Sequence, residues 1–253
     1  MIKAKVYSNN ITKAKFIIKN PMTTPYEAKV KKESLNYINH IKLKANGKLV
    51  FNIKTSYFIS KNPLFKFNYK DLNTSTLKLQ YTDNNNLTYK NITIKKDMLT
   101  YTNKKSSLLK NVEPLSNLKT HANSIKAIKN IFGDIILIEG GIRIKAPKIA
   151  ENGNSVPVNI RSNIRFKSIV LFIQPSDAYS YENNLLIDPI TYTDNKVFFI
   201  CQWFNTPYSI ANFHIRIKMQ LGESNLIAVL EAENGKFYVI KQKVISSIGG
   251  GAV

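Results

Sequence analysis

Few residues in this sequence could carry covalent or metal chemistry, and their spacing excludes most familiar sites. The chain of 253 residues has one cysteine, Cys201, so an internal disulfide and a cysteine-based metal cluster are both excluded. The three histidines, His40, His121 and His214, are too far apart in sequence to form a recognisable ligand motif. Cys201 lies in the apolar run KVFFICQWF, where cysteine acts as a small buried hydrophobic residue. We therefore predict no metal site and no cofactor.

The carboxylates and glycines give no catalytic motif either. Asp71, Asp83 and Asp177 stand where turn residues are expected. No G-x-S-x-G or H-E-x-x-H motif occurs, and Gly140-Gly141 lacks the strand-to-helix context of a phosphate-binding loop. The sequence thus predicts a protein that is not an enzyme. What remains unusual is the closing Ile248-Gly249-Gly250-Gly251-Ala252-Val253, which combines conformational freedom with the absence of a reactive side chain.

Short alternating strands must position whatever site the chain has. Residues 3–98 alternate between apolar and polar positions and are interrupted by turn clusters, which is an all-β pattern. Asn46-Gly47 and the segment Asp83–Asn86 predict tight hairpins. Residues 102–122 lose the alternation and become polar, which is typical of a linker.

The remainder begins with a helix and returns to strands. The segment NSIKAIKNIFGD, residues 123–134, predicts one short helix that ends at Gly133. Seven or so strands follow, with Asn234-Gly235 at a hairpin tip. The chain is therefore predicted to be all-β, with two β-sandwiches in tandem. The expected divisions are residues 1–101, a linker at 102–122, and residues 123–253.

The net charge of +21 is concentrated in the first part of the chain. Residues 1–105 contain 21 Lys and Arg against 5 Asp and Glu, whereas residues 123–253 contain 14 against 10. The lysines alternate with apolar residues, as in Lys42-Leu43-Lys44, which favours a solvated sheet face. Attraction of an acidic protein or anion is a second possibility. Nucleic acid is the least favoured, because 33 of the 37 cations are lysine and the arginine forks that read bases are scarce.

Several stretches resemble the SoxYZ family of sulfur carriers from bacterial thiosulfate oxidation. PKIAENGNSVPVNI (Pro147–Ile160), the helix AIKNIFGD and the stretch from Phe213 to Gly250 are similar to SoxY. IIKNPMTTPY (Ile17–Tyr26), ISKNPLFKF (Ile59–Phe67) and LQYTDNNNLTYKNITI resemble its partner SoxZ, although Asn20 stands where that family usually has histidine. The resemblance covers nearly the whole chain in the order SoxZ, linker, SoxY.

This resemblance implies a fold and a way of working. Both SoxZ and SoxY are immunoglobulin-like sandwiches that pair tightly, and a fusion would make that pairing intramolecular. SoxY ends in a mobile glycine arm whose cysteine holds sulfur intermediates for the enzymes and c-type cytochrome of a periplasmic pathway. Aligning the I-G-G of the arm assigns the arm to Gly249, Gly250 and Gly251, with Gly251 at the position of the cysteine.

Three hypotheses of function follow. The chain is a fused carrier whose arm cysteine has been replaced, or a SoxYZ-like interaction module that carries no sulfur, or a basic protein that binds anions or nucleic acid. The apolar runs are strand-sized, so no membrane span is expected. No secretory signal is visible in MIKAKVYSNN, which leaves the cytoplasm open beside the periplasm that the resemblance implies.

Overall fold

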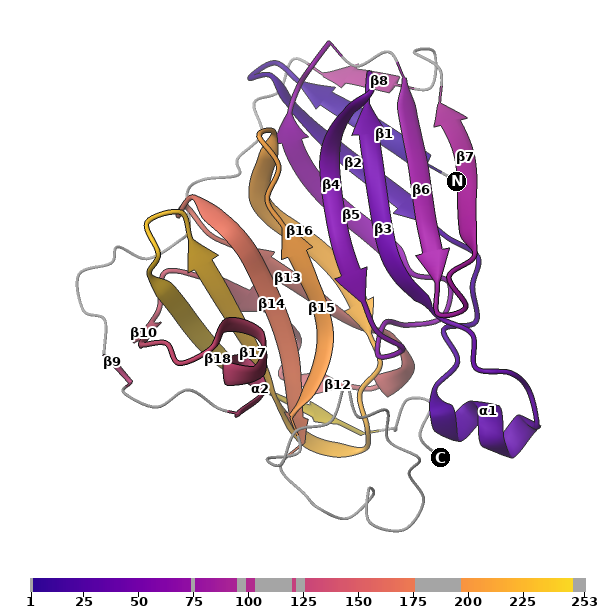
Figure 1. The fold of residues 1–253 in the computed structure, drawn as a ribbon, viewed down its shortest axis with the longest axis vertical. Helices are drawn as coiled ribbons and strands as arrows, with labels where there is room; N and C mark the ends of the chain where they lie inside the picture. The colour runs from indigo at the N-terminus through magenta and orange to yellow at the C-terminus, as the bar shows by residue number, and fades with distance from the viewer. Residues whose placement is uncertain are drawn as a thin grey trace.

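Two β-sheets packed face to face make up most of the molecule, as the computed structural model shows (Figure 1). The structure describes residues 2–73, 76–94, 99–102, 120–121, 126–175 and 197–247. The smaller sheet has seven strands in the order β11-β13-β16-β5-β2-β1-β8. Their bounds in chain order are β1 Ile2–Tyr7, β2 Ile11–Ile17, β5 Leu64–Lys70, β8 Leu99–Thr102, β11 Arg143–Lys145, β13 Val156–Arg161 and β16 Ser209–Ile217.

The larger sheet has eleven strands, ordered β7-β6-β3-β4-β15-β14-β17-β18-β10-β9, with β12 also paired to β18. The strands of its first part are β3 Ile38–Ala45, β4 Lys48–Thr55, β6 Leu77–Asp83 and β7 Thr88–Ile94. Those of its second part are β9 Thr120–His121, β10 Leu137–Glu139, β12 Ile149–Ala150, β14 Phe166–Pro175, β15 Phe198–Phe204, β17 Gly222–Ala232 and β18 Phe237–Ser246. The predicted all-β fold of two sandwiches is confirmed.

The two sandwiches are joined edge to edge, because each sheet continues from the first part of the chain into the second. In the smaller sheet β5 pairs antiparallel with β16, and in the larger sheet β4 pairs antiparallel with β15. These pairings satisfy backbone groups that would otherwise form exposed sheet edges. We call the two pairings together the seam.

Aromatic side chains continue the core across the seam. Phe51 of β4 has its ring centroid 6.2 Å from that of Trp203 on β15 and 6.0 Å from that of Phe213 on β16. All three side chains are almost fully buried. Because burying a large aromatic side chain contributes about 1.5–3 kcal/mol, the seam is a hydrophobic core and not a polar contact between finished domains.

In the described part of the chain, two α-helices lie outside the sheets. The helix predicted at the start of the second part is present as α2, Lys126–Phe132, and Gly133 ends it with φ +76°. The helix α1, Pro25–Lys31, in the first part was not predicted from the sequence. This helix begins with a capping box in which the side chains of Thr24 and Glu27 satisfy each other's backbone N–H groups.

The tight turns lie where the sequence predicts them. Asn46-Gly47 joins β3 to β4 with φ of 47° and 80°, the left-handed values that the turn requires. Asn234-Gly235 joins β17 to β18.

Residues 103–119 of the predicted linker lie outside the described residues, so the boundaries drawn at 101 and 122 remain predictions. Within the described part of the chain, no helix is long and apolar enough to span a membrane.

Candidate functional site

The predicted arm residues Gly249, Gly250 and Gly251 lie outside the described residues, which end at Ser247. The structure does describe the residues that precede the predicted arm. We call this region the arm root and define it as Ile245–Ser247 together with its neighbours Ile149 and Ala150.

Strands on both sides hold the arm root. On one side Ser246 of β18 pairs with Gly222 of β17, and on the other it pairs with Ala150 of β12. The backbone N–H of Ser247 donates to the carbonyl of Ala150 at 3.0 Å. Ser246 is 1% exposed. The chain is therefore fixed through Ser247, because its backbone groups are already paired.

The motif A-E-N-G-x-x-V-P builds the support beneath the arm root. It begins with Ala150, the partner of Ser246, and Asn152 then caps a short 3-10 turn, Gly153–Ser155, by accepting from Asn154 N at 2.9 Å. The carbonyl of Gly153 accepts from Met219 N at 2.7 Å. The motif thus ties the arm root to the segment that crosses between the sheets, residues 218–221.

Three exposed apolar side chains lie at the arm root. Ile149 is 63% exposed and lies opposite Ile245, which is 42% exposed, on the neighbouring strand. Leu221, beside the Gly222–Ser246 pair, is 67% exposed. Exposed apolar side chains that gather in one place are typical of an interaction surface. We call Ile149, Ile245 and Leu221 the apolar rim.

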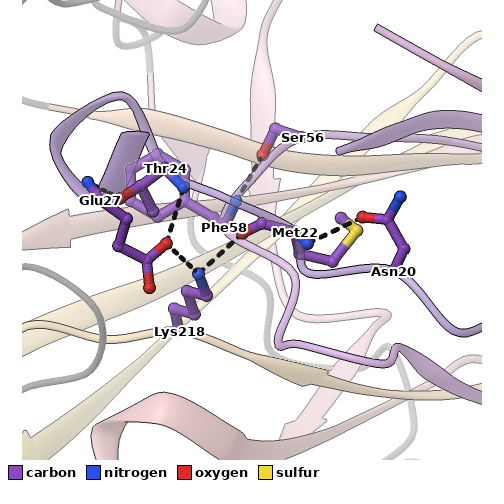
Figure 2. Close-up of polar contacts among 7 residues, drawn as sticks. All are labelled: Asn20, Met22, Thr24, Glu27, Ser56, Phe58 and Lys218. Carbon is purple, nitrogen blue, oxygen red and sulfur yellow. Dashed lines mark hydrogen bonds and ion pairs between the residues drawn. The ribbon is translucent and has the colours of Figure 1, made fainter. Parts of the chain in front are cut away.

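A buried ion pair fixes the crossing segment to the first part of the chain (Figure 2). Lys218 is 4% exposed, and its Nζ donates to the carbonyl of Met22 at 2.7 Å and to Glu27 Oε2 at 2.8 Å. Its backbone N–H donates to the carbonyl of Phe58 at 2.6 Å. The crossing segment spans at most about 14 Å from Lys218 to Gly222, so the ion pair also lies near the arm root.

The pKa values of this pair reflect burial and mutual attraction. Burial alone would raise the pKa of Glu27, but hydrogen bonds from Lys218 and from the backbone of Thr24 bring it below its ordinary value. Burial lowers the pKa of Lys218, and Glu27 opposes that shift. The carboxylate therefore stays ionised at neutral pH, where it partners the lysine.

The segment Asn20-Pro21-Met22 presents the carbonyl that Lys218 needs. Asn20 Oδ1 accepts from Met22 N at 2.7 Å, and Asn20 Nδ2 donates to Asn36 Oδ1 at 2.8 Å. Met22 is fully buried and has φ +50°, a left-handed value that is costly for a residue other than glycine. Asn20 thus has a structural role at the position where the SoxZ resemblance leads one to expect histidine.

Cys201 lies where the sequence predicts, in a buried strand. It pairs with Thr55 across the seam and with Leu171 on the other side, and it is 1% exposed. Burial raises the pKa of its thiol strongly. A reactive cysteine needs access and thiolate character, so Cys201 is inert in the folded protein.

The histidines and aspartates also serve the fold. His40 Nε2 lies 2.7 Å from Asn52 Oδ1, and Asp83 Oδ1 accepts from the backbone N–H groups of Asn85 and Leu87 in a turn. Asp71 accepts from the hydroxyl of Thr12. No group of three metal-ligating side chains occurs among the residues that the structure describes. Asp177 and the side chain of His121 lie outside them.

The fold and the anchored arm root define an all-β protein of paired immunoglobulin-like sandwiches. Residues 2–105 match the family model described as sulphur oxidation protein SoxZ. We call these matched residues, 2–105, the SoxZ domain. No curated protein matches the chain.

Solved structures provide the second comparison. The chain is similar to the sulfur carrier protein SoxY from Chlorobium limicola f thiosulfatophilum, with 27% identity over 49% of this chain and 94% of that one, and a TM-score of 0.37. It also matches superoxide reductase (neelaredoxin) from Ignicoccus hospitalis, with 11% identity over 42% of this chain and 79% of that one (TM-score 0.31). A third match is the human F-spondin reeler domain, with 12% identity over 43% and 90% (TM-score 0.30). The family model supports the SoxZ-type part of the predicted fusion.

Proposed function

We propose that this chain is a non-catalytic, carrier-type protein of sulfur oxidation. Its arm root docks on the pathway enzymes and the c-type cytochrome, and Gly251 blocks covalent loading of sulfur. The observation that carries the proposal is the arm root itself. The end of β18 and the following Ser247 are held by hydrogen bonds, and the exposed side chains of the apolar rim lie beside them. A fixed root beside an apolar rim suits a flexible arm that enters the pocket of a docked partner.

Sulfur loading requires an exposed thiolate. In the loading step a cysteine thiolate and thiosulfate form a sulfur–sulfur bond, and the two electrons released reduce a c-type cytochrome. Cys201, the one cysteine of the chain, is buried in β15 between the strands β4 and β14. Its thiol therefore cannot reach such a partner. Gly251, which aligns with the arm cysteine of SoxY, supplies no sulfur.

The loading experiment compares four proteins: the chain as it is, Cys201→Ser, Gly251→Cys and the double variant. Each is incubated with thiosulfate and an oxidised c-type loading cytochrome of a SoxYZ pathway, and intact masses are measured. We expect an adduct only on the two proteins that contain Gly251→Cys. An adduct on the unchanged chain that also appears on Cys201→Ser would contradict our account of the missing thiol.

The docking experiment measures binding of the same cytochrome by surface plasmon resonance. We expect the double variant Ile149→Glu/Ile245→Glu to weaken binding by about tenfold or more, since charge would replace apolar contact at the centre of an interface. Ile136→Glu is the matched control, because Ile136 is 64% exposed and precedes β10 at the opposite end of β18. Equal losses in both variants would exclude the apolar rim as the docking site.

A second candidate is an interaction module that docks on the same partners and never carries sulfur. It shares the apolar rim, and the Gly251→Cys variant distinguishes the two. A carrier that lost its cysteine becomes loadable, whereas an interaction module with the same substitution binds the cytochrome and takes no sulfur. Both candidates place the protein in the periplasm, where SoxYZ-type pathways work. The basic surface supports a separate proposal below.

A further inference from the structure

A row of polar side chains, four of them lysines, crosses six neighbouring strands of the seven-stranded sheet. Residues directly opposite one another in successive pairings are Lys145, Asn159, His214, Lys66, Lys15 and Lys3, in that order. Neighbouring strands lie about 4.8 Å apart, so the row is about 24 Å long. All six side chains are exposed or half-buried on the outer face of the sheet. We call this row the basic row.

The seam creates the basic row. Lys3, Lys15 and Lys66 belong to the SoxZ domain, and the other three residues belong to the second part of the chain. The junction is the pairing of His214 on β16 with Lys66 on β5. Each part of the chain supplies three of the six residues of the row.

The row costs electrostatic free energy in the isolated protein. Like charges directly opposite each other on paired strands are destabilising, and Lys15 faces Lys66 in this way. Burial and the nearby cations Lys15, Lys13 and Arg216 all lower the pKa of Lys66. A surface that retains such repulsion gains stability from a partner of opposite charge.

No carboxylate of its own strands neutralises this face. The strands β1, β2, β5, β11, β13 and β16 contain no Asp or Glu. In the larger sheet, strands of the second part of the chain do supply such partners, because Lys167 pairs with Glu231 at 3.4 Å and Lys243 with Glu223 at 2.7 Å. In its first part, Lys44 and Lys78 face each other as like charges.

The middle of the row lines a groove of about 220 Å³, to which Lys13 and Arg161 contribute beside Lys66, Lys145 and His214. Arg161 Nε donates to Asn159 Oδ1 at 2.8 Å, which fixes the guanidinium against the sheet. The groove therefore offers several cationic donors to an acceptor that projects into it, as the carboxylate of an Asp or Glu side chain would.

We propose that the basic row is the docking surface for a protein partner that presents a matching row of carboxylates. A flat sheet and flexible lysines suit an acidic protein face, since complementary charge speeds encounter and sets register. Single-stranded nucleic acid fits less well, because binding it uses aromatic side chains on which bases stack. In the outward positions of these strands, as far as side chains are described, Tyr7 at the end of β1 is the one aromatic residue. This docking does not depend on the arm or on sulfur loading.

The test measures fluorescence anisotropy of a labelled poly-L-glutamate peptide of about 20 residues with the full chain, at low and physiological salt. Lys15→Gln/Lys66→Gln removes two opposed lysines of the row. The matched control is Lys44→Gln/Lys78→Gln, which removes an opposed, exposed pair from the larger sheet and changes the net charge equally. Parallel titrations use oligo-dT of similar length and sulfate.

We expect the peptide to bind and the row variant to weaken its affinity about fivefold or more, with the control within about twofold. The row variant should melt no lower than the unchanged protein, since it relieves repulsion. Equal losses of affinity in both double variants would show that the peptide responds only to the net charge of the protein, and would overturn the proposal. Tighter binding of oligo-dT than of the peptide, or saturable binding of sulfate alone, would also overturn it. None of these outcomes bears on loading of Gly251→Cys, so the two proposals fail separately.

Discussion

Replacing Lys218 with methionine tests whether the buried ion pair holds the two parts of the chain together. Lys218→Met keeps most of the aliphatic packing but removes both hydrogen bonds of Nζ, to Met22 O and Glu27 Oε2. Hydrogen bonds that involve a charged group contribute about 1.5–3 kcal/mol each. The Glu27 side chain is 21% exposed and regains some hydration, so we expect a net loss of about 3 kcal/mol of unfolding free energy. For a chain of this size that lowers Tm by about 6–12 °C.

A matched substitution separates this pair from ion pairs in general. Lys243 pairs with Glu223 at 2.7 Å, but its side chain is 59% exposed. Lys243→Met should therefore cost less than about 1 kcal/mol. Differential scanning calorimetry of both variants makes the comparison. If Lys218→Met melts within a degree or two of Lys243→Met, the ion pair adds little and the aromatic core of the seam alone joins the two parts.

The pH dependence gives an independent measure of the same pair. Because the folded-state pKa of Glu27 is below its unfolded value of about 4.5, its contribution to stability is complete above that value. It is lost as pH falls through the lower folded pKa. The Tm difference between the unchanged protein and Glu27→Gln should therefore be constant near neutral pH and shrink in acid. A Tm difference that grows in acid would show that folding raises the pKa of Glu27 and does not lower it.

Three further predictions concern other parts of the fold. Burial holds the pKa of His214 at about 4, below the unfolded 6.5, so the unfolded state binds the extra proton and stability falls as pH drops from 6.5 to 4. His214→Gln should flatten the dependence of Tm on pH in this range. If the Tm of the variant and of the unchanged protein fall in parallel, His214 is not the group responsible. A Cβ at Gly141 would lie 2.7 Å from Ile164 Cδ1, so Gly141→Ala should cost about 1–3 kcal/mol more than Gly235→Ala, which has a similar φ but open space around it; equal denaturation midpoints would contradict the clash. Cleavage at a protease site inserted between residues 102 and 122 should leave a single particle in gel filtration, because the sheets are continuous, whereas two separate species would argue against the seam.

Local signals in the sequence predict the local structure well. Asn46-Gly47 and Asn234-Gly235 specify hairpins through the φ values that their own residues adopt, and α2 follows from its apolar spacing and Gly133. The helix α1 has an equally local signal, Thr24-Pro25 followed by Glu27. That signal is hard to recognise because the seven-residue helix lies within a stretch dominated by alternating strands.

Features that depend on distant pairing are beyond local reasoning. The Oγ of Ser56 donates to the carbonyl of Phe199 at a sequence separation of 143, and no periodicity in either strand identifies the other as its neighbour. Lys218 stands in an alternating stretch, Ile215-Arg216-Ile217-Lys218, where a lysine predicts a solvated position. Only the crossing between sheets places it against Glu27. The basic row escapes sequence analysis for the same reason, since its register exists only across the seam.

The seam also has a consequence for the order in which the protein can fold. The strands β4 and β5 are complete once about 70 residues have been synthesised, yet their partners β15 and β16 begin only at Phe198 and Ser209. Until then the SoxZ domain carries two unpaired edges, which are open to pairing with other nascent chains. Encoding both parts in one polypeptide turns an encounter between two molecules into closure of a loop, whose entropic cost rises only slowly with length. Fusion therefore shortens the interval in which those edges are exposed, a kinetic protection that the finished structure no longer displays.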